Sequence, residues 1–288
     1  WEDRGETGSP ESIYQRREEY RCEVPKDVLV LTCGVDVQCD RLAYEVVGHG
    51  YRYESWGVKS GILWGAPDED ETWFKLDEVL EHEYRREDDK VLKISACCVD
   101  SGAYTAHVYL QCALRSNRRV RAIKGRAATI KTEYVDKGKY VDFVNPKTAR
   151  VAKCWLNIVN VDAGKQRIMD ALKVQTAGPK YCHFPQNEEA GYDLQYFEGL
   201  LSEKQVKKRA HGRDVLAWVK ISSGGRNEAL DCRNYSLVAL SLTGVNLNDE
   251  EVIRQLSTGE KEDMKSAKRQ VKRQPKTRRN RALDADDW

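Results

Sequence analysis

The feature that most constrains the fold is an apolar run that ends at a single acid. The run Val28–Val35 is almost wholly apolar, and Asp36 follows it directly. Its length and its content of Val and Leu predict a buried strand over 28–37. A second run, Ile94–Val99, is followed directly by Asp100. The sequence therefore predicts two buried strands, each with a carboxylate at or near its end.

A third acid lies at the start of a predicted helix. The segment 227–242 has helical periodicity, and Asp231 falls in its first turns. Val238 and Leu242 follow Asp231 at spacings of seven and eleven residues, which places all three on the same, inner face of the helix. Carboxylates at two strand ends and one helix start can converge on one point of a sheet.

Such a convergence predicts a site for two divalent metal ions. Mg²⁺ and Mn²⁺ prefer oxygen ligands, and a pair of these ions can activate a water and stabilise the leaving oxygen of a phosphodiester. We expect Asp36 to bridge both ions, while Asp100 and Asp231 each hold one. Glu228, one helical turn before Asp231, is expected to be an alternate or supporting ligand. Gly34 is expected to leave room beside Asp36 on the same face of the strand.

Several basic residues are candidates for contact with DNA. A strand is predicted over 120–123, and a cation just after it could contact a phosphate. A hairpin turn and the following strand end could orient DNA or assist proton transfer. These supporting residues are Lys124, Arg126, His211, Lys220 and Arg226.

Each of these residues also has a plainer interpretation. A lone Asp at a strand end is usually a turn or cap residue, and Asp231 could simply form an ion pair with Arg226 or Arg233. The basic candidates could be solvated surface residues. The metal site is favoured because three acids occur at three such positions in one topological order.

The order of predicted elements indicates the fold class. Three strands forming an antiparallel meander are followed by helix, strand, helix and strand, which predicts an α/β fold with a mixed sheet flanked by helices. This order resembles a ribonuclease-H-like fold. We expect an arm or linker over 1–27, the folded domain over 28–245, and a short helix with a basic tail over 246–288. A surface hairpin with a turn at Lys137-Gly138 is also predicted.

Charge and cysteine content restrict the class of protein further. The net charge is +2, but nine basic residues and no acids lie between Lys265 and Arg281, so the rest of the chain is acidic. An acidic body fits a metal-loaded site with local basic patches better than DNA binding by charge alone. No stretch approaches 18 consecutive apolar residues, so we expect no membrane span. The nine cysteines contain no C-x-x-C pair, which favours reduced thiols in a core.

Five segments resemble the C-terminal half of tailed-phage terminase large subunits of the lambda gpA type. The resemblance extends from about Val28 to Thr243, and the last of the five motifs is the most specific. The matching segments are Gly34–Gln38, Val99–Gly102, Lys124-Gly125, Tyr196–Glu198 and Arg226–Arg233.

The resemblance implies a function and a set of partners. It implies a ribonuclease-H-like endonuclease domain that cuts concatemeric phage DNA, with metal ligands at Asp36, Asp100 and Asp231. It also implies an N-terminal packaging ATPase in the full-length chain, the small terminase subunit and the procapsid portal as partners, double-stranded DNA as substrate, and the host cell cytoplasm as location. Two alternatives stay open: another ribonuclease-H-like nuclease of the resolvase type, and a non-catalytic DNA-gripping or portal-docking module.

Overall fold

A single large mixed sheet organises the domain. The structure is a computed structural model, and it describes residues 8–126, 133–210 and 213–258. The eight strands of the sheet, in spatial order, are β10 (Cys182–His183), β3 (Ser55–Trp64), β2 (Arg41–His49), β1 (Val30–Val37), β6 (Ile94–Asp100), β7 (Val120–Arg126), β9 (Val151–Asn160) and β8 (Lys139–Val144).

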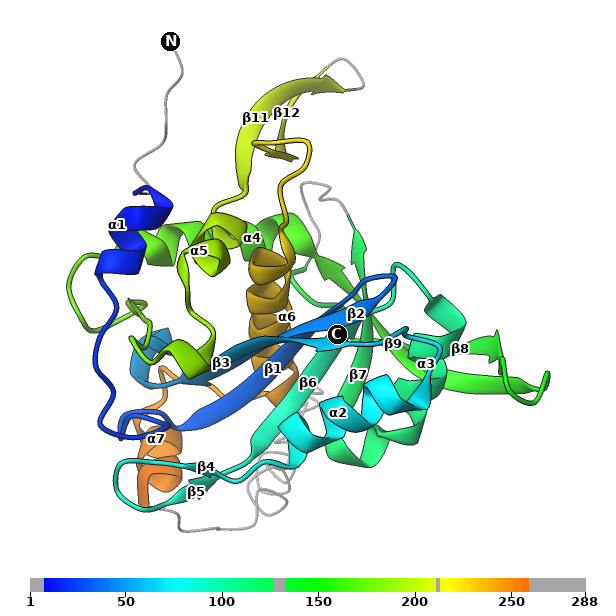
Figure 1. Cartoon of the computed structure of the whole chain (residues 1–288), viewed down its shortest axis with the longest axis horizontal. Coiled ribbons are helices and arrows are strands. Elements are labelled where there is room, and N and C mark those ends of the chain that lie inside the picture. Colours follow the sequence, from blue (N-terminus) through cyan, green and yellow to red (C-terminus); the bar gives the residue numbers. More distant parts are fainter. Residues whose placement is uncertain (1–7, 127–132, 211–212, 259–288) are drawn as a thin grey trace, which may run out of the picture.

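The strand directions confirm the predicted fold class. Strands β1, β2 and β3 form an antiparallel meander, whereas β6, β7 and β9 run parallel to β1. Strand β8 is antiparallel to β9, and β10 is parallel to β3. Helices cover both faces of this mixed sheet (Figure 1). The arrangement is a ribonuclease-H-like α/β fold, as the order of elements predicted.

The helices differ in the sheet face that they cover. Helix α6 (Glu228–Thr243) packs on β1, β2 and β6, with α4 (Val161–Leu172) and α5 (Leu194–Leu200) beside it, whereas α2 (Asp70–Glu81) and α3 (Thr105–Leu114) cover the opposite face (Figure 1). Residues of β6 alternate between the two layers: Cys97 packs in the α2–α3 core and Cys98 in the α6 core. This period of two places Asp100 on the α6 face.

Two short hairpins and a last helix complete the described chain. Strands β4 (Tyr84–Arg85) and β5 (Val91–Leu92) form a small ladder. Strands β11 (Glu203–Ala210) and β12 (Arg213–Lys220) form a hairpin that projects from the domain at the top of Figure 1. Helix α7 (Glu250–Thr258) packs beneath the start of β1 through Ile253 and Leu256.

The segment before β1 lies against the domain, although its composition predicts an arm or linker. Helix α1 (Pro10–Gln15) buries Ile13 in a core with α4 and α5 residues. Further along, Glu18 accepts a hydrogen bond from Nδ1 of His183 at 2.9 Å, and Nε2 of His183 lies 2.8 Å from Glu54. A few apolar and ionic anchors therefore hold a mostly polar segment in place.

The prediction of a hairpin at Lys137-Gly138 is wrong. Val135 pairs with Val159, and β8, which begins at Lys139, pairs with the preceding part of β9. Both sides of Gly138 therefore pair with the same strand instead of with each other. Gly138 has a φ of +70°, and a Cβ there would lie 2.4 Å from Nε1 of Trp155. The glycine permits a local irregularity at the sheet edge rather than a turn.

Candidate active site

Strand register brings the first two predicted carboxylates together. Val35 of β1 pairs in parallel with Val99 of β6, so the next residues, Asp36 and Asp100, lie side by side at the ends of adjacent strands. Gly34 faces α6, because a Cβ there would lie 1.9 Å from the carbonyl oxygen of Cys232. Asp36 follows Gly34 by two residues and therefore faces α6 as well.

The third carboxylate comes from the first turns of α6. Asp231 immediately precedes Cys232, the residue that meets Gly34. The charges of both Asp231 and Asp100 act on Asp36. The three acids predicted from the sequence therefore gather on the α6 face of the sheet.

Burial raises the pKa values of all three acids, and repulsion by neighbouring acids adds to this effect at Asp36 and Asp231. Burial, followed by the charge of Asp231, raises the pKa of Asp36 to about 7 despite a hydrogen bond from Gln38. Burial raises the pKa of Asp231 to about 6, although Lys165 opposes the rise. Burial likewise raises the pKa of Asp100. Ionised carboxylates are disfavoured here unless a cation joins them.

Each carboxylate already has a protein partner. Oδ2 of Asp36 accepts from Nε2 of Gln38 at 2.5 Å, and Oδ2 of Asp100 accepts from the amide of Gly102 at 3.0 Å. Oδ2 of Asp231 accepts from Nδ2 of Asn227 at 2.7 Å. In the described part of the chain, no three His, Cys, Asp or Glu side chains are grouped closely enough to hold a metal ion.

The donor set nevertheless suits a hard divalent cation. It consists of carboxylate oxygens, which Mg²⁺ and Mn²⁺ prefer. Three carboxylates are gathered in a largely buried region, where the charges of Asp231 and Asp100 help to raise the pKa of Asp36. A cation placed among them would relieve this repulsion. The residues therefore fit a divalent metal in charge and chemistry, although the side chains point to their present partners.

The carboxylate of Glu228 forms ion pairs with two arginines. Its Oε1 accepts from Nη2 of Arg41 at 2.6 Å and from Nε of Arg226 at 3.4 Å. Burial acts to raise its pKa, but these arginines and its own backbone amide outweigh burial, and the pKa is lowered. Glu228 still lies near enough for its charge to act on Asp36.

Two of the predicted basic residues lie close to the predicted acids, Lys124 near Asp100 and Arg226 beside Glu228. Lys124 and Arg126 are exposed on β7, and the charge of Lys124 partly offsets the rise that burial causes in the pKa of Asp100. Lys220 is exposed at the end of β12, where its Nζ donates to the carbonyl oxygen of Gly225 at 3.1 Å. Arg226 is partly exposed beside Glu228. His211 lies outside the described residues.

Several site residues were missed by the sequence reasoning. Lys165 of α4 contacts Asp231 at 3.2 Å and pairs with Glu203 at the base of β11. Lys165 and Glu203 are 38 positions apart in the sequence, and no local sequence pattern predicts that they pair. Asn227 and Gln38 do lie close in sequence to predicted ligands, at i−4 and i+2, so their polar side chains were the available signal.

A second ionic cluster lies further along α6. Nη1 of Arg233 donates to Oε1 of Glu45 at 2.6 Å, and the hydroxyls of Tyr192 and Tyr196 donate to the same oxygen at 3.2 and 2.8 Å. The Arg233 and Glu45 side chains are only 3% and 0% exposed. The cluster ties α6 to β2.

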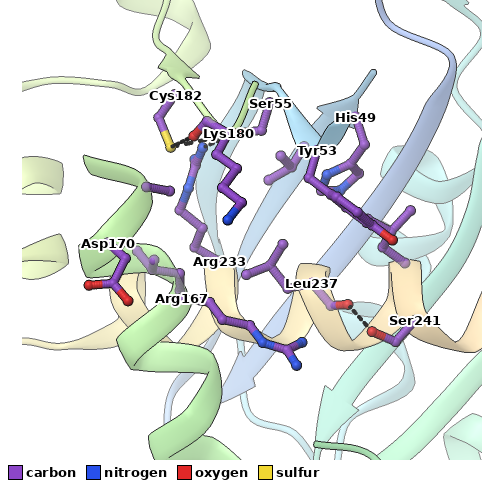
Figure 2. A pocket seen from close by; sticks show the side chains of 14 residues that line it. His49, Tyr53, Ser55, Arg167, Asp170, Lys180, Cys182, Arg233, Leu237 and Ser241 are labelled. Atoms are coloured by element: carbon purple, nitrogen blue, oxygen red, sulfur yellow. Dashed lines mark hydrogen bonds between the residues drawn. The ribbon is translucent and has the colours of Figure 1, made fainter. Parts of the chain in front are cut away.

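Two pockets adjoin these clusters. One of about 410 Å³ is lined by Arg233, His49, Tyr53 and Lys180, among others, and extends to Leu237 and Ser241 on α6 (Figure 2). It shares no residue with the carboxylate site. The other, of about 310 Å³, follows β2 and β3 and reaches the site at Arg226 and Glu228.

The mixed sheet, with acids at two strand ends and one helix start, places the chain in the class of ribonuclease-H-like α/β domains. The sequence agrees with that class, because the family model described as terminase large subunit gpA, endonuclease domain, matches residues 1–254. The chain belongs to this family.

Individual relatives agree with the family. The chain is 32% identical over 252 residues to the terminase large subunit of Escherichia phage lambda, and 29% identical over 253 residues to that of Enterobacteria phage P21. Each match covers 84% of this chain but 37% of the relative, so the chain spans little more than a third of either relative's length.

One solved structure is also similar. It is a point mutant of the nuclease domain of the large terminase subunit gp2 of bacterial virus Sf6, with manganese. The two chains are 12% identical with a TM-score of 0.41, and the match covers 80% of this chain and 93% of the other. Among the helices that the structure describes, none is long and apolar enough to cross a membrane.

Proposed function

We propose that this domain is a Mg²⁺- or Mn²⁺-dependent endonuclease that hydrolyses phosphodiester bonds of double-stranded DNA. The observation that carries the proposal is the convergence of Asp36, Asp100 and Asp231, with raised pKa values, in a chain of the terminase endonuclease family. Buried acids of like charge are costly to folding, so their presence together at one point favours a cation-binding role.

Each carboxylate has a role in this proposal. Asp36, Asp100 and Asp231 would hold the divalent ions, with Glu228 supporting them. When bound, the ions would supply an activated water and stabilise the leaving oxygen. Gln38, Gly102 and Asn227 donate to only one oxygen of each carboxylate, so these hydrogen bonds do not by themselves exclude a cation.

The surrounding cations would hold the DNA backbone. Lys124 and Arg126 are exposed on β7 next to Asp100, while Arg226 lines the pocket that reaches Glu228. We propose that these residues contact phosphates, that Lys220 contributes from the end of β12, and that His211, which lies outside the described residues, also contributes. Backbone contacts of this kind position DNA without reading its sequence.

The biological setting follows from the family and is also a proposal. The domain would cut concatemeric phage DNA in the host cell cytoplasm during genome packaging. In a longer chain it would act with a packaging ATPase, the small terminase subunit and the procapsid portal. The resolvase alternative is disfavoured by the family match.

Nicking of supercoiled plasmid tests the proposal. Wild-type protein in millimolar Mn²⁺ should nick the plasmid, and Asp36→Asn, Asp100→Asn and Asp231→Asn should each lose activity by about a thousandfold, the equivalent of roughly 4 kcal/mol. Asp142→Asn is the matched control, because Asp142 is exposed on β8 away from the acids. Cutting that persists in EDTA would contradict the metal mechanism. No cutting by the wild type would favour a non-catalytic gripping or docking module.

A further inference from the structure

A closed ring of polar side chains lies behind Asp231. Nζ of Lys165 donates to both carboxylate oxygens of Glu203 at 2.8 Å and lies 3.2 Å from Oδ1 of Asp231. Nδ2 of Asn227 lies 2.9 Å from Oε1 of Glu203 and 2.7 Å from Oδ2 of Asp231. The ring is secluded from solvent, since the side chains of Lys165, Glu203 and Asp231 are 9%, 6% and 15% exposed.

The ring shares one positive charge between two carboxylates, and the sharing is unequal. An ammonium group has three N–H donors. Lys165 makes two short contacts with Glu203 and one longer contact with Asp231. The charge of Glu203 therefore draws the ammonium toward itself and away from Asp231.

The position of the ammonium bears on cation binding at Asp231. Lys165 and a metal ion are attracted to the same carboxylate, so each weakens the attraction of the other. If Glu203 lost its charge, Lys165 would become a partner of Asp231 alone. An ammonium fully paired with Asp231 would compete more strongly with a metal ion.

We propose that Glu203 is a positioning residue that restrains Lys165 and so sets the affinity of Asp231 for a divalent cation. The inference rests on the proposed function, since it needs a metal at Asp231. It assigns Glu203 and Lys165 no part in bond cleavage. Glu203 is the first residue of β11, and Lys165 and Asn227 belong to α4 and the N-terminus of α6, so three elements meet in the ring.

The test is a titration with Mn²⁺ in which free Mn²⁺ is followed by its paramagnetic resonance signal, without DNA. Glu203→Gln keeps the shape of the side chain and should weaken Mn²⁺ binding by about tenfold, the low end for loss of an outer partner of a metal ligand. Lys165→Gln removes the competing charge and should strengthen binding. The double variant should bind at least as tightly as the wild type. Glu188→Gln, at an exposed position, is the control and should change nothing.

The direction of the change in Mn²⁺ affinity in each variant distinguishes this positioning role from a merely structural one. A structural ring would lose affinity and melting temperature together in both single variants, and most in the double variant. Unchanged affinity in Glu203→Gln, or weaker binding in Lys165→Gln, would overturn the inference. If Glu203→Gln does not fold, weaker binding in Lys165→Gln would still overturn the inference.

Asp36→Asn separates the inference from the proposed function. Mn²⁺ binding by the wild type that disappears in Asp36→Asn supports the metal site itself. With that result in hand, an unchanged Glu203→Gln variant overturns the positioning role alone. Absence of Mn²⁺ binding by the wild type would overturn both.

Discussion

Two buried ionic clusters on α6, centred on residues only two positions apart, are built in opposite ways. Arg233 meets one carboxylate, Glu45, and two tyrosine hydroxyls donate to the same oxygen of that carboxylate, Oε1, whereas its buried Oε2 accepts no hydrogen bond from the described residues. Asp231 belongs to a group of acids whose nearest cation, Lys165, is bound more closely by Glu203. The first cluster is matched in charge, and the second carries an excess of negative charge.

The difference separates a structural from a functional use of buried charge. A matched and hydrogen-bonded ion pair fixes the position of a helix. Removing one member leaves the other charge buried without a partner, which strongly lowers the stability of the fold. Unmatched carboxylates lower the stability of the apo domain. Such a cost is typical of a site arranged to bind a cation.

The largest effect should come from breaking the matched cluster. Arg233→Ala should lower the free energy of unfolding by about 3–5 kcal/mol, because Glu45 would be left buried and unpaired. Urea denaturation measures the change. Arg254→Ala provides a control on α7, where an exposed pair with Glu251 should contribute less than about 1 kcal/mol. Equal losses in the free energy of unfolding in the two variants would show that the buried pair stabilises the fold no more than the exposed pair.

The unmatched cluster should respond in the opposite direction. In EDTA at about pH 8, Asp36→Asn should stabilise the domain by at most about 4 kcal/mol, at 1.36 kcal/mol for each unit by which the pKa of Asp36 is raised. The amide oxygen can still accept the hydrogen bond from Gln38. Thermal unfolding followed by circular dichroism measures the gain. A loss of stability would show that Asp36 serves the fold.

An intermediate effect is expected where α6 crosses β1. Gly34→Ala should cost about 1–3 kcal/mol, since the new methyl group would overlap the backbone of Cys232 and force α6 outward. Gly224→Ala is the matched control, because a Cβ at Gly224 would meet no atom within 4 Å. Denaturation curves that shift equally for both variants would mean that α6 does not lie this close to β1.

The smallest effect concerns the segment before β1. Burial acts to lower the pKa of His183, but hydrogen bonds with Glu18 and Glu54 outweigh burial and raise it. The charged imidazole therefore stabilises the fold below the pKa of the unfolded chain, and this stability is lost as pH rises through the folded pKa. His183→Gln should destabilise the domain by about 1 kcal/mol or less near pH 6 and by less near pH 9. If the destabilisation caused by His183→Gln grew with pH, a charged His183 paired with Glu18 and Glu54 would be contradicted.

Local sequence patterns predicted the two strands and the helix that carry the three acids. Asp36 and Asp100 follow apolar runs, and Asp231 has a helical period, so strand and helix geometry alone brings them together. The role expected of Gly34 was incorrect, because the space beside Asp36 is taken by the backbone of α6 rather than left open. A glycine in a strand does not reveal which neighbour approaches it.

Interactions between distant residues could not be predicted in the same way. The Arg233–Glu45 pair joins positions 188 residues apart, and the Lys165–Glu203 pair depends on where α4 meets the hairpin. Gly138 was assigned to a turn because Lys-Gly commonly forms one, but the long strand β9 offers pairing partners on both sides of it. Such outcomes depend on which edges of the sheet are free.

The cysteines of the domain differ sharply in accessibility. All nine are free, and seven of them are buried; Cys22 is partly buried and Cys39 is exposed. Cys39 lies in the turn between β1 and β2, three residues after Asp36. A thiol-reactive fluorophore should therefore attach first at Cys39, in the turn that follows the strand of Asp36. Cys39 thus provides a site for a fluorescent label that could report the binding of metal and DNA without any engineered cysteine.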